Sequence, residues 1–143
     1  MRAIDLTLKL LGLADVLCKW QAMMARLDKA RRVKVARYAL RIAESLARMV
    51  SALERLEADA TDRAARRGAL REVGRLAGYM ETIVMALRGH VDGRRLAGVE
   101  RRLQGLAIDD IVSDTPTNEP PRHIERIVAA EGYMRALADS LQT

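Results

Sequence analysis

The stretch KARRVKVARYALRIAESLARMVSALERL, residues 29–56, decides the fold. It contains no proline and no glycine, and most of its residues are good helix formers. Its apolar residues recur in steps of three and four, which is the spacing of a helix face. At 100° per residue they cover roughly 200° of the helix, so this helix is predicted to contact two neighbours at once. They form two seams, which are Val33, Ala36, Leu40, Ala43, Ala47 and Val50, and Ile42, Leu46, Met49, Leu53 and Leu56.

The same spacing continues on both sides of this stretch. A broad apolar helix is predicted over residues 4–27, and Asp28 is expected to cap the helix that follows. Thr61 or Asp62 is expected to cap a helix over 63–88, which Gly89 stops. The predicted inward residues of this helix are Ala69, Val73, Leu76, Met80, Ile83 and Leu87.

Two shorter segments complete the predicted bundle. A fourth helix begins after Asp92 and ends near Gly105, and residues 107–118 read as an acidic loop. The fifth helix covers 119–141, with proline in its first turn, where the missing N–H is not needed. Its buried face is expected to consist of Ile124, Ile127, Val128, Met134, Leu137 and Leu141.

No run of residues has the alternation and the β-branched content of a strand. With 143 residues the chain is expected to form one domain. The predicted fold is therefore an all-α, antiparallel bundle of about five helices over residues 1–143. It consists of a basic body at 1–106, the acidic loop at 107–118 and a C-terminal helix at 119–141.

The charge is unevenly distributed along the chain. Residues 26–104 hold 19 Lys or Arg against 10 Asp or Glu, whereas residues 105–143 hold 3 against 7. This asymmetry favours a partner with negative charge. A GC-rich genome gives the same excess of arginine over lysine without any selection for binding, so composition alone leaves both explanations open.

Two basic stripes are the main candidate binding residues. One follows the helix at 29–56 within about 80° of its circumference, and Glu44 interrupts it. The other has an arginine at every fourth position of the helix at 63–88, where neighbouring like charges repel by a few tenths of a kcal/mol. Such rows can neutralise phosphates, but a solvated helix face has the same pattern. The candidate nucleic-acid-binding residues are Lys34, Arg37, Arg41 and Arg48, with Arg55 on the same stripe, and Arg63, Arg67, Arg71 and Arg75.

Gly74 and Gly78 lie on the arginine side of the second stripe's helix and are the candidate interface residues. Small side chains at these positions let another backbone approach, either a helix of the same bundle or a second copy of the chain. Each glycine inside a helix costs up to about 1 kcal/mol relative to alanine. A close contact with another helix, which is possible because glycine has no side chain, would offset this cost.

Few residues are available for catalysis, so a non-enzyme is expected. Cys18 lies on the apolar first helix and reads as a buried hydrophobe. His90 and His123 have too few neighbouring ligands for a metal site, and no cofactor is predicted. The acidic cluster of Asp109, Asp110 and Asp114 lacks a second acidic motif facing it, so capping and solubility explain it better than Mg²⁺ binding.

A single cysteine indicates a reducing compartment, and the protein is expected to be cytoplasmic. Charges within the first twenty residues, including Asp5, Lys9 and Asp15, argue against a signal peptide and a membrane span. Reversible binding at an anionic membrane, through the apolar first helix and the basic body, is a weaker alternative, which the acidic Asp5 and Asp15 disfavour.

The first functional expectation is a non-catalytic interaction module that self-associates or forms a small subunit of a larger assembly. The alternative is nucleic-acid binding without sequence preference. This alternative is suggested by a broad likeness, because the chain is similar in size, helicity and basicity to small helical subunits of ribonucleoprotein complexes. Trp20 is expected in the core, and Tyr38, Tyr79 and Tyr133 appear scattered along the sequence. Any nucleic-acid mode is therefore expected to use the backbone rather than base stacking.

Overall fold

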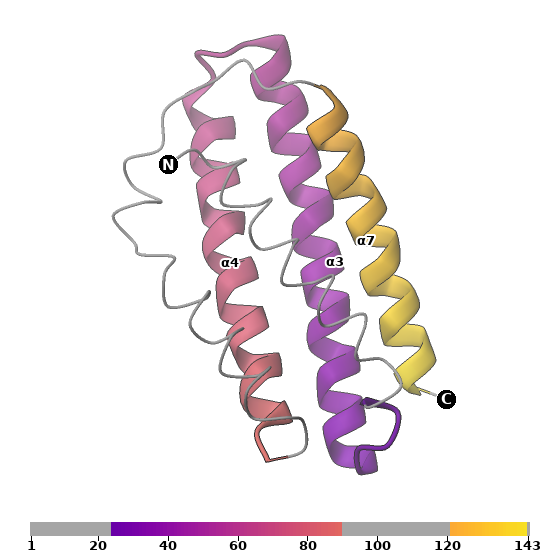
Figure 1. Ribbon diagram of the computed structural model, residues 1–143. Helices are drawn as coiled ribbons and strands as arrows, with labels where there is room; N and C mark the ends of the chain where they lie inside the picture. The colour runs from indigo at the N-terminus through magenta and orange to yellow at the C-terminus, as the bar shows by residue number, and fades with distance from the viewer. Residues whose placement is uncertain (1–23, 90–120, 143) are drawn as a thin grey trace.

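The computed structural model describes residues 24–89 and 121–142 (Figure 1). These residues form three helices, α3 at Lys29–Ala58, α4 at Arg63–Leu87 and α7 at Pro121–Gln142. No residue of the two described ranges is in a strand, which confirms the all-α class. The expected helix at 92–106, the acidic loop at 107–118 and most of the expected first helix lie outside the described residues. The count of five helices therefore stays a prediction.

The predicted caps determine where the helices begin. The Asp28 carboxylate accepts a hydrogen bond from the backbone N–H of Arg31, and Asp62 accepts one from Ala65 at 2.9 Å. Each bond satisfies an N–H group that the first turn leaves without a partner. The α4 helix ends at Leu87, and Gly89 follows with φ +78°, a left-handed conformation that glycine adopts readily.

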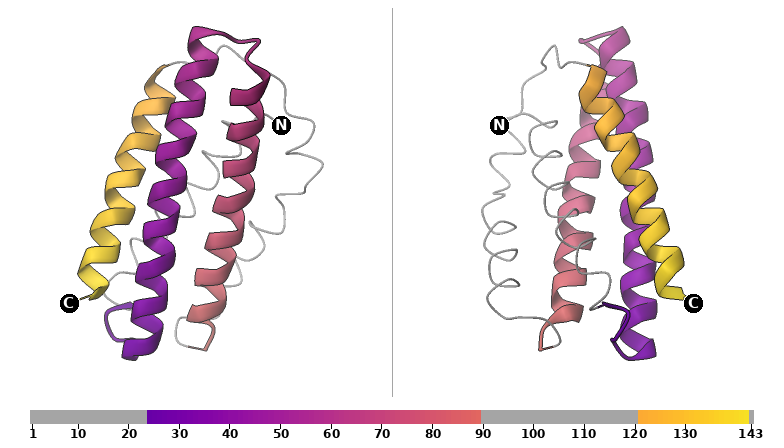
Figure 2. Two further views of the ribbon diagram at one scale, coloured as in Figure 1. Left: turned by 180° about the vertical axis from the view of Figure 1, so that it is seen from behind. Right: turned by 45° about the vertical axis from the view of Figure 1, so that its right-hand side comes forward.

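The α3 helix lies between the other two described helices (Figures 1 and 2). It packs against α4 on one side and α7 on the other, and it runs antiparallel to both. The wide apolar surface of residues 29–56 is thus buried against two neighbours, as predicted. The fully buried larger side chains are Met24, Ile42, Leu46, Met49, Leu76, Met80, Ile83, Leu87 and Ile127.

Part of the predicted core is wrong. Val33 is 40% exposed and Leu40 36%, while Val35 and Ala39 are fully buried in their place. At 100° per residue, Val33 and Leu40 lie on the outer edge of the apolar surface, whereas Val35 and Ala39 lie near the middle of the buried arc. Val128 of α7 is likewise 51% exposed, because only a narrow side of this flanking helix is covered.

Candidate functional site

The two predicted stripes are both on the outside of the molecule. Every one of their residues is exposed to solvent. At helical pitch, the α3 stripe lies on the part of its helix next to the α3–α4 boundary, and Arg71 and Arg75 of the α4 stripe lie on the same side of that boundary. Each earlier arginine of the α4 row lies 40° further around the helix, so Arg63 is on the side of α4 opposite Glu72. We call the combined surface the basic face; it consists of Lys34, Arg37, Arg41, Arg48 and Arg55 of α3 and Arg63, Arg67, Arg71 and Arg75 of α4.

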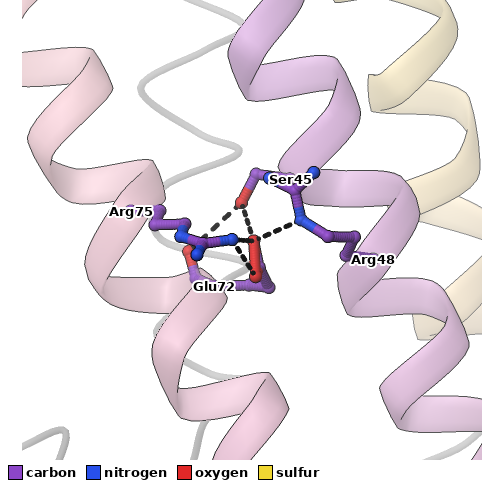
Figure 3. A network of polar contacts seen from close by, with 4 residues as sticks. All are labelled: Ser45, Arg48, Glu72 and Arg75. Carbon is purple, nitrogen blue, oxygen red and sulfur yellow. Dashed lines mark hydrogen bonds and ion pairs between the residues drawn. The ribbon is translucent and has the colours of Figure 1, made fainter.

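The two stripes meet at a buried carboxylate, that of Glu72 (Figure 3). The Nε atom of Arg48 donates to Glu72 Oε1 at 2.9 Å, and Nη1 of Arg75 donates to Oε2 at 3.0 Å and lies 3.3 Å from Oε1. The hydroxyl of Ser45 donates to Oε1 at 3.0 Å. The Glu72 side chain is 6% exposed, but those of Arg48 and Arg75 are 46% and 44% exposed. One anion inside the helix pair therefore holds two cations that remain half in water.

This carboxylate explains how α4 tolerates part of its arginine row. Like charges four residues apart repel, as between Arg71 and Arg75. Glu72 lies three residues before Arg75 and neutralises part of its charge. A second acid acts at the end of the face, where Nη2 of Arg55 donates to the carboxylate of Asp62 at 3.0 Å. The backbone N–H of Ala65, and then the Arg55 charge, lower the pKa of Asp62 below its ordinary value.

The remaining cations of the basic face have no such partner. Among the described residues, no acid forms an ion pair with Lys34, Arg37, Arg63, Arg67 or Arg71. Glu44 is exposed within the α3 stripe and reduces its charge, as expected from the sequence. The face thus has solvated cations on each helix and an ion-paired cluster where the two rows meet.

The tyrosines differ from the sequence-based expectation. Tyr38 of α3 and Tyr79 of α4 are not scattered, because their ring centroids lie 5.9 Å apart across the helix boundary. The guanidinium carbon of Arg41 lies 5.0 Å from the centroid of Tyr38, within the range of a cation–π contact. Two half-buried aromatic rings therefore lie beside the arginines, whereas Tyr133 is on α7 and 64% exposed.

Both candidate interface glycines are exposed on α4, on the side predicted for them. A Cβ atom built on Gly74 or Gly78 meets no atom of the described residues within 4 Å. Neither glycine is thus required by the packing of α3, α4 and α7. Met85 shares their side of the helix at helical pitch and is 58% exposed.

Sequence reasoning missed the buried cluster, although the sequence contains a signal for it. Glu72 follows Ala65 by seven residues and precedes Leu76 by four, so it occupies a position on the apolar side of α4. Ser45 lies between Ile42 and Met49 at steps of three and four. A polar residue inside an apolar seam on each of two neighbouring helices is a pattern that predicts a buried polar contact.

Within residues 24–89 and 121–142, no three His, Cys, Asp or Glu side chains gather where they could hold a metal ion. Cys18, His90 and the acidic cluster at 109–114 lie outside the described residues, and His123 is in the first turn of α7. None of α3, α4 and α7 has an apolar stretch long enough to cross a membrane.

No protein-family model, curated protein or solved structure matches this chain at a significant level.

Proposed function

We propose that this protein is a non-catalytic binding module whose basic face takes the sugar–phosphate backbone of a nucleic acid without reading its sequence. The observation that carries the proposal is that two exposed cation rows on adjacent helices, α3 and α4, meet at Glu72. Guanidinium groups donate strong, charge-assisted hydrogen bonds to phosphate oxygens. Contacts of this kind give affinity and register but carry no sequence information.

The charges of the face set how the complex responds to salt. Lys34, Arg37, Arg41, Arg67 and Arg71 are free of ion pairs with the described acids, and the Glu72 cluster adds one net positive charge. Each phosphate that these cations neutralise releases condensed counterions, with a slope of about −0.9 per contact on duplex DNA. Engagement of these five cations and of the cluster would thus give a slope of about −5 in a plot of log K against log salt concentration.

The test is a binding titration with fluorescently labelled RNA and DNA, each single-stranded and duplex, over a series of salt concentrations. The variant Arg67→Glu/Arg71→Glu reverses two solvated cations of the basic face. The variant Arg126→Glu/Arg135→Glu makes the same change in net charge on α7 and serves as the control. We expect the first variant to lower the affinity at least about tenfold and to flatten the salt slope by about 2, with a much smaller effect of the control. Equal losses in the two variants, or absence of binding by the wild-type protein at low salt, would refute the proposal.

Self-association is the second candidate, and one observation favours it. Gly74, Gly78 and Met85 lie on one side of α4 and are exposed, and a Cβ atom added at either glycine meets no described atom within 4 Å. Small residues allow two helices to approach closely, and an exposed methionine adapts to a partner surface. Light scattering over a range of protein concentrations distinguishes the candidates, because a strict monomer that binds nucleic acid eliminates this one.

A further inference from the structure

The cluster around Glu72 leaves donors unused on its outer side. A guanidinium group has five N–H donors in one plane. Arg48 gives only Nε to the carboxylate, and Arg75 gives only Nη1 (Figure 3). No other described residue accepts a hydrogen bond from either group. Both side chains are about half exposed, so water or a ligand reaches these donors.

The charge of the cluster is also unbalanced. Two guanidinium groups surround one carboxylate, and the fourth member, Ser45, is neutral. The surplus is a single positive charge. A phosphodiester group has a single negative charge and oxygens that accept from planar guanidinium groups, so it matches the cluster in both charge and hydrogen bonding.

We propose that Arg48 and Arg75 together clamp one phosphodiester group of the bound strand, and that Glu72 is the positioning residue that holds them. This inference rests on the proposed function and names where on the basic face the strand is fixed. Nitrogens of both side chains lie within hydrogen-bond distance of the same oxygen, Glu72 Oε1, so the two guanidinium groups are near enough to contact the same phosphate.

The clamp differs from the other arginines of the face in its preorganisation. A free arginine side chain loses conformational entropy when it is fixed on a ligand, at a cost of up to about 2 kcal/mol. Arg48 and Arg75 are already held by a carboxylate that is anchored between α3 and α4. Arg37 and Arg71 have no such support, so a phosphate bound to them must order the side chain as well.

Substitution by lysine tests the clamp, because lysine keeps the charge but lacks the planar fork. Arg48→Lys and Arg75→Lys are compared with Arg126→Lys and Arg135→Lys, which make the same change at exposed positions of α7, outside the basic face. In full-length protein, we expect each clamp variant to lower the affinity for a labelled duplex about tenfold, the loss of roughly one charge-assisted hydrogen bond. The two controls should stay within about twofold, and circular dichroism melts verify that all four variants are folded.

The outcomes separate the clamp from the proposed function. If wild-type protein binds and all four lysine variants bind equally well, the clamp is wrong and the basic face stands as a diffuse cationic surface. If wild-type protein does not bind, the proposed function itself fails.

Glu72→Gln tests the positioning role independently. This change adds one net positive charge to the face, so charge alone predicts tighter binding. Loss of the positioning carboxylate predicts weaker binding, which we expect at about threefold or more. A tighter complex would overturn the positioning role of Glu72.

Discussion

The stability of the α3–α4 pair should depend on the two arginines that hold Glu72. We consider the double variant Arg48→Met/Arg75→Met, which keeps the aliphatic length of both side chains and removes both guanidinium groups. The carboxylate, 6% exposed, would retain only the hydroxyl of Ser45 as a side-chain donor. Breaking a buried ion pair by removing its partner costs about 3–5 kcal/mol.

The exposure of the two arginines limits this loss. Because both arginines are half in water in the wild-type protein, their attraction is screened and the lower end of the range applies. We expect the free energy of unfolding to fall by about 3 kcal/mol at pH 7.

Urea denaturation followed by circular dichroism at 222 nm measures this loss. The matched control is Arg67→Met/Arg71→Met, which removes the same charge from two positions without a described partner and should shift stability by less than about 1 kcal/mol. Adding Glu72→Leu to the first double variant should recover most of the loss, because no buried charge remains. A double variant that is no less stable than its control would refute the argument that the arginines compensate a buried charge.

Three further outcomes follow from the helix ends and the glycines. The pKa values of three aspartates at the helix ends are lowered below the ordinary value of 3.8. The main cause is a hydrogen bond from the Arg31 side chain for Asp28 and from the Thr61 side chain for Asp59. For Asp62 it is the hydrogen bond from the backbone N–H of Ala65. The stabilisation by these three aspartates is complete above the unfolded pKa and is lost as the pH falls through 3.8 and below, so acid titration of the unfolding free energy should show a decline there. Asp62→Ala removes the cap of α4 and should cost about 1 kcal/mol in thermal unfolding at pH 7. Gly74→Ala and Gly78→Ala should each stabilise α4 by up to about 1 kcal/mol, because no described atom opposes the added methyl group; a drop in melting temperature that depends on protein concentration would instead indicate a contact between copies.

The helices of the described region could be predicted from the sequence because their signals are local. Asp28 and Asp62 are capping residues, Gly89 is a stop signal, and the seam from Ala69 to Leu87 has uninterrupted helical spacing. All these signals depend on neighbours within a turn or two, which the sequence places directly. Helix bounds were therefore predicted to within about two residues, the usual uncertainty of helix ends.

The core and the site were predicted less well because they depend on which neighbour covers which side. The apolar surface of α3 is wider than the part that α4 and α7 bury, so spacing alone could not decide between Val33 and Val35. The contact between Tyr38 and Tyr79 joins residues 41 positions apart, and it depends on the register of two helices. The exposed arginines could be identified because the spacing of residues along one helix predicts its exposed side. The meeting of the two stripes at Glu72 could not, because it depends on how α3 and α4 pack against each other.

A charge inside the α3–α4 interface also selects one alignment of the two helices. Faces rich in alanine and leucine tolerate a slide by one turn, because each new neighbour is again apolar. Such a slide would move the carboxylate of Glu72 away from Ser45 and place it opposite Ile42 or Met49, both fully buried and unable to donate a hydrogen bond. Sliding therefore leaves the desolvated charge without its α3 donors, Ser45 and Arg48, and only Arg75 of its own helix stays beside it, so the cluster favours a single register of the hairpin.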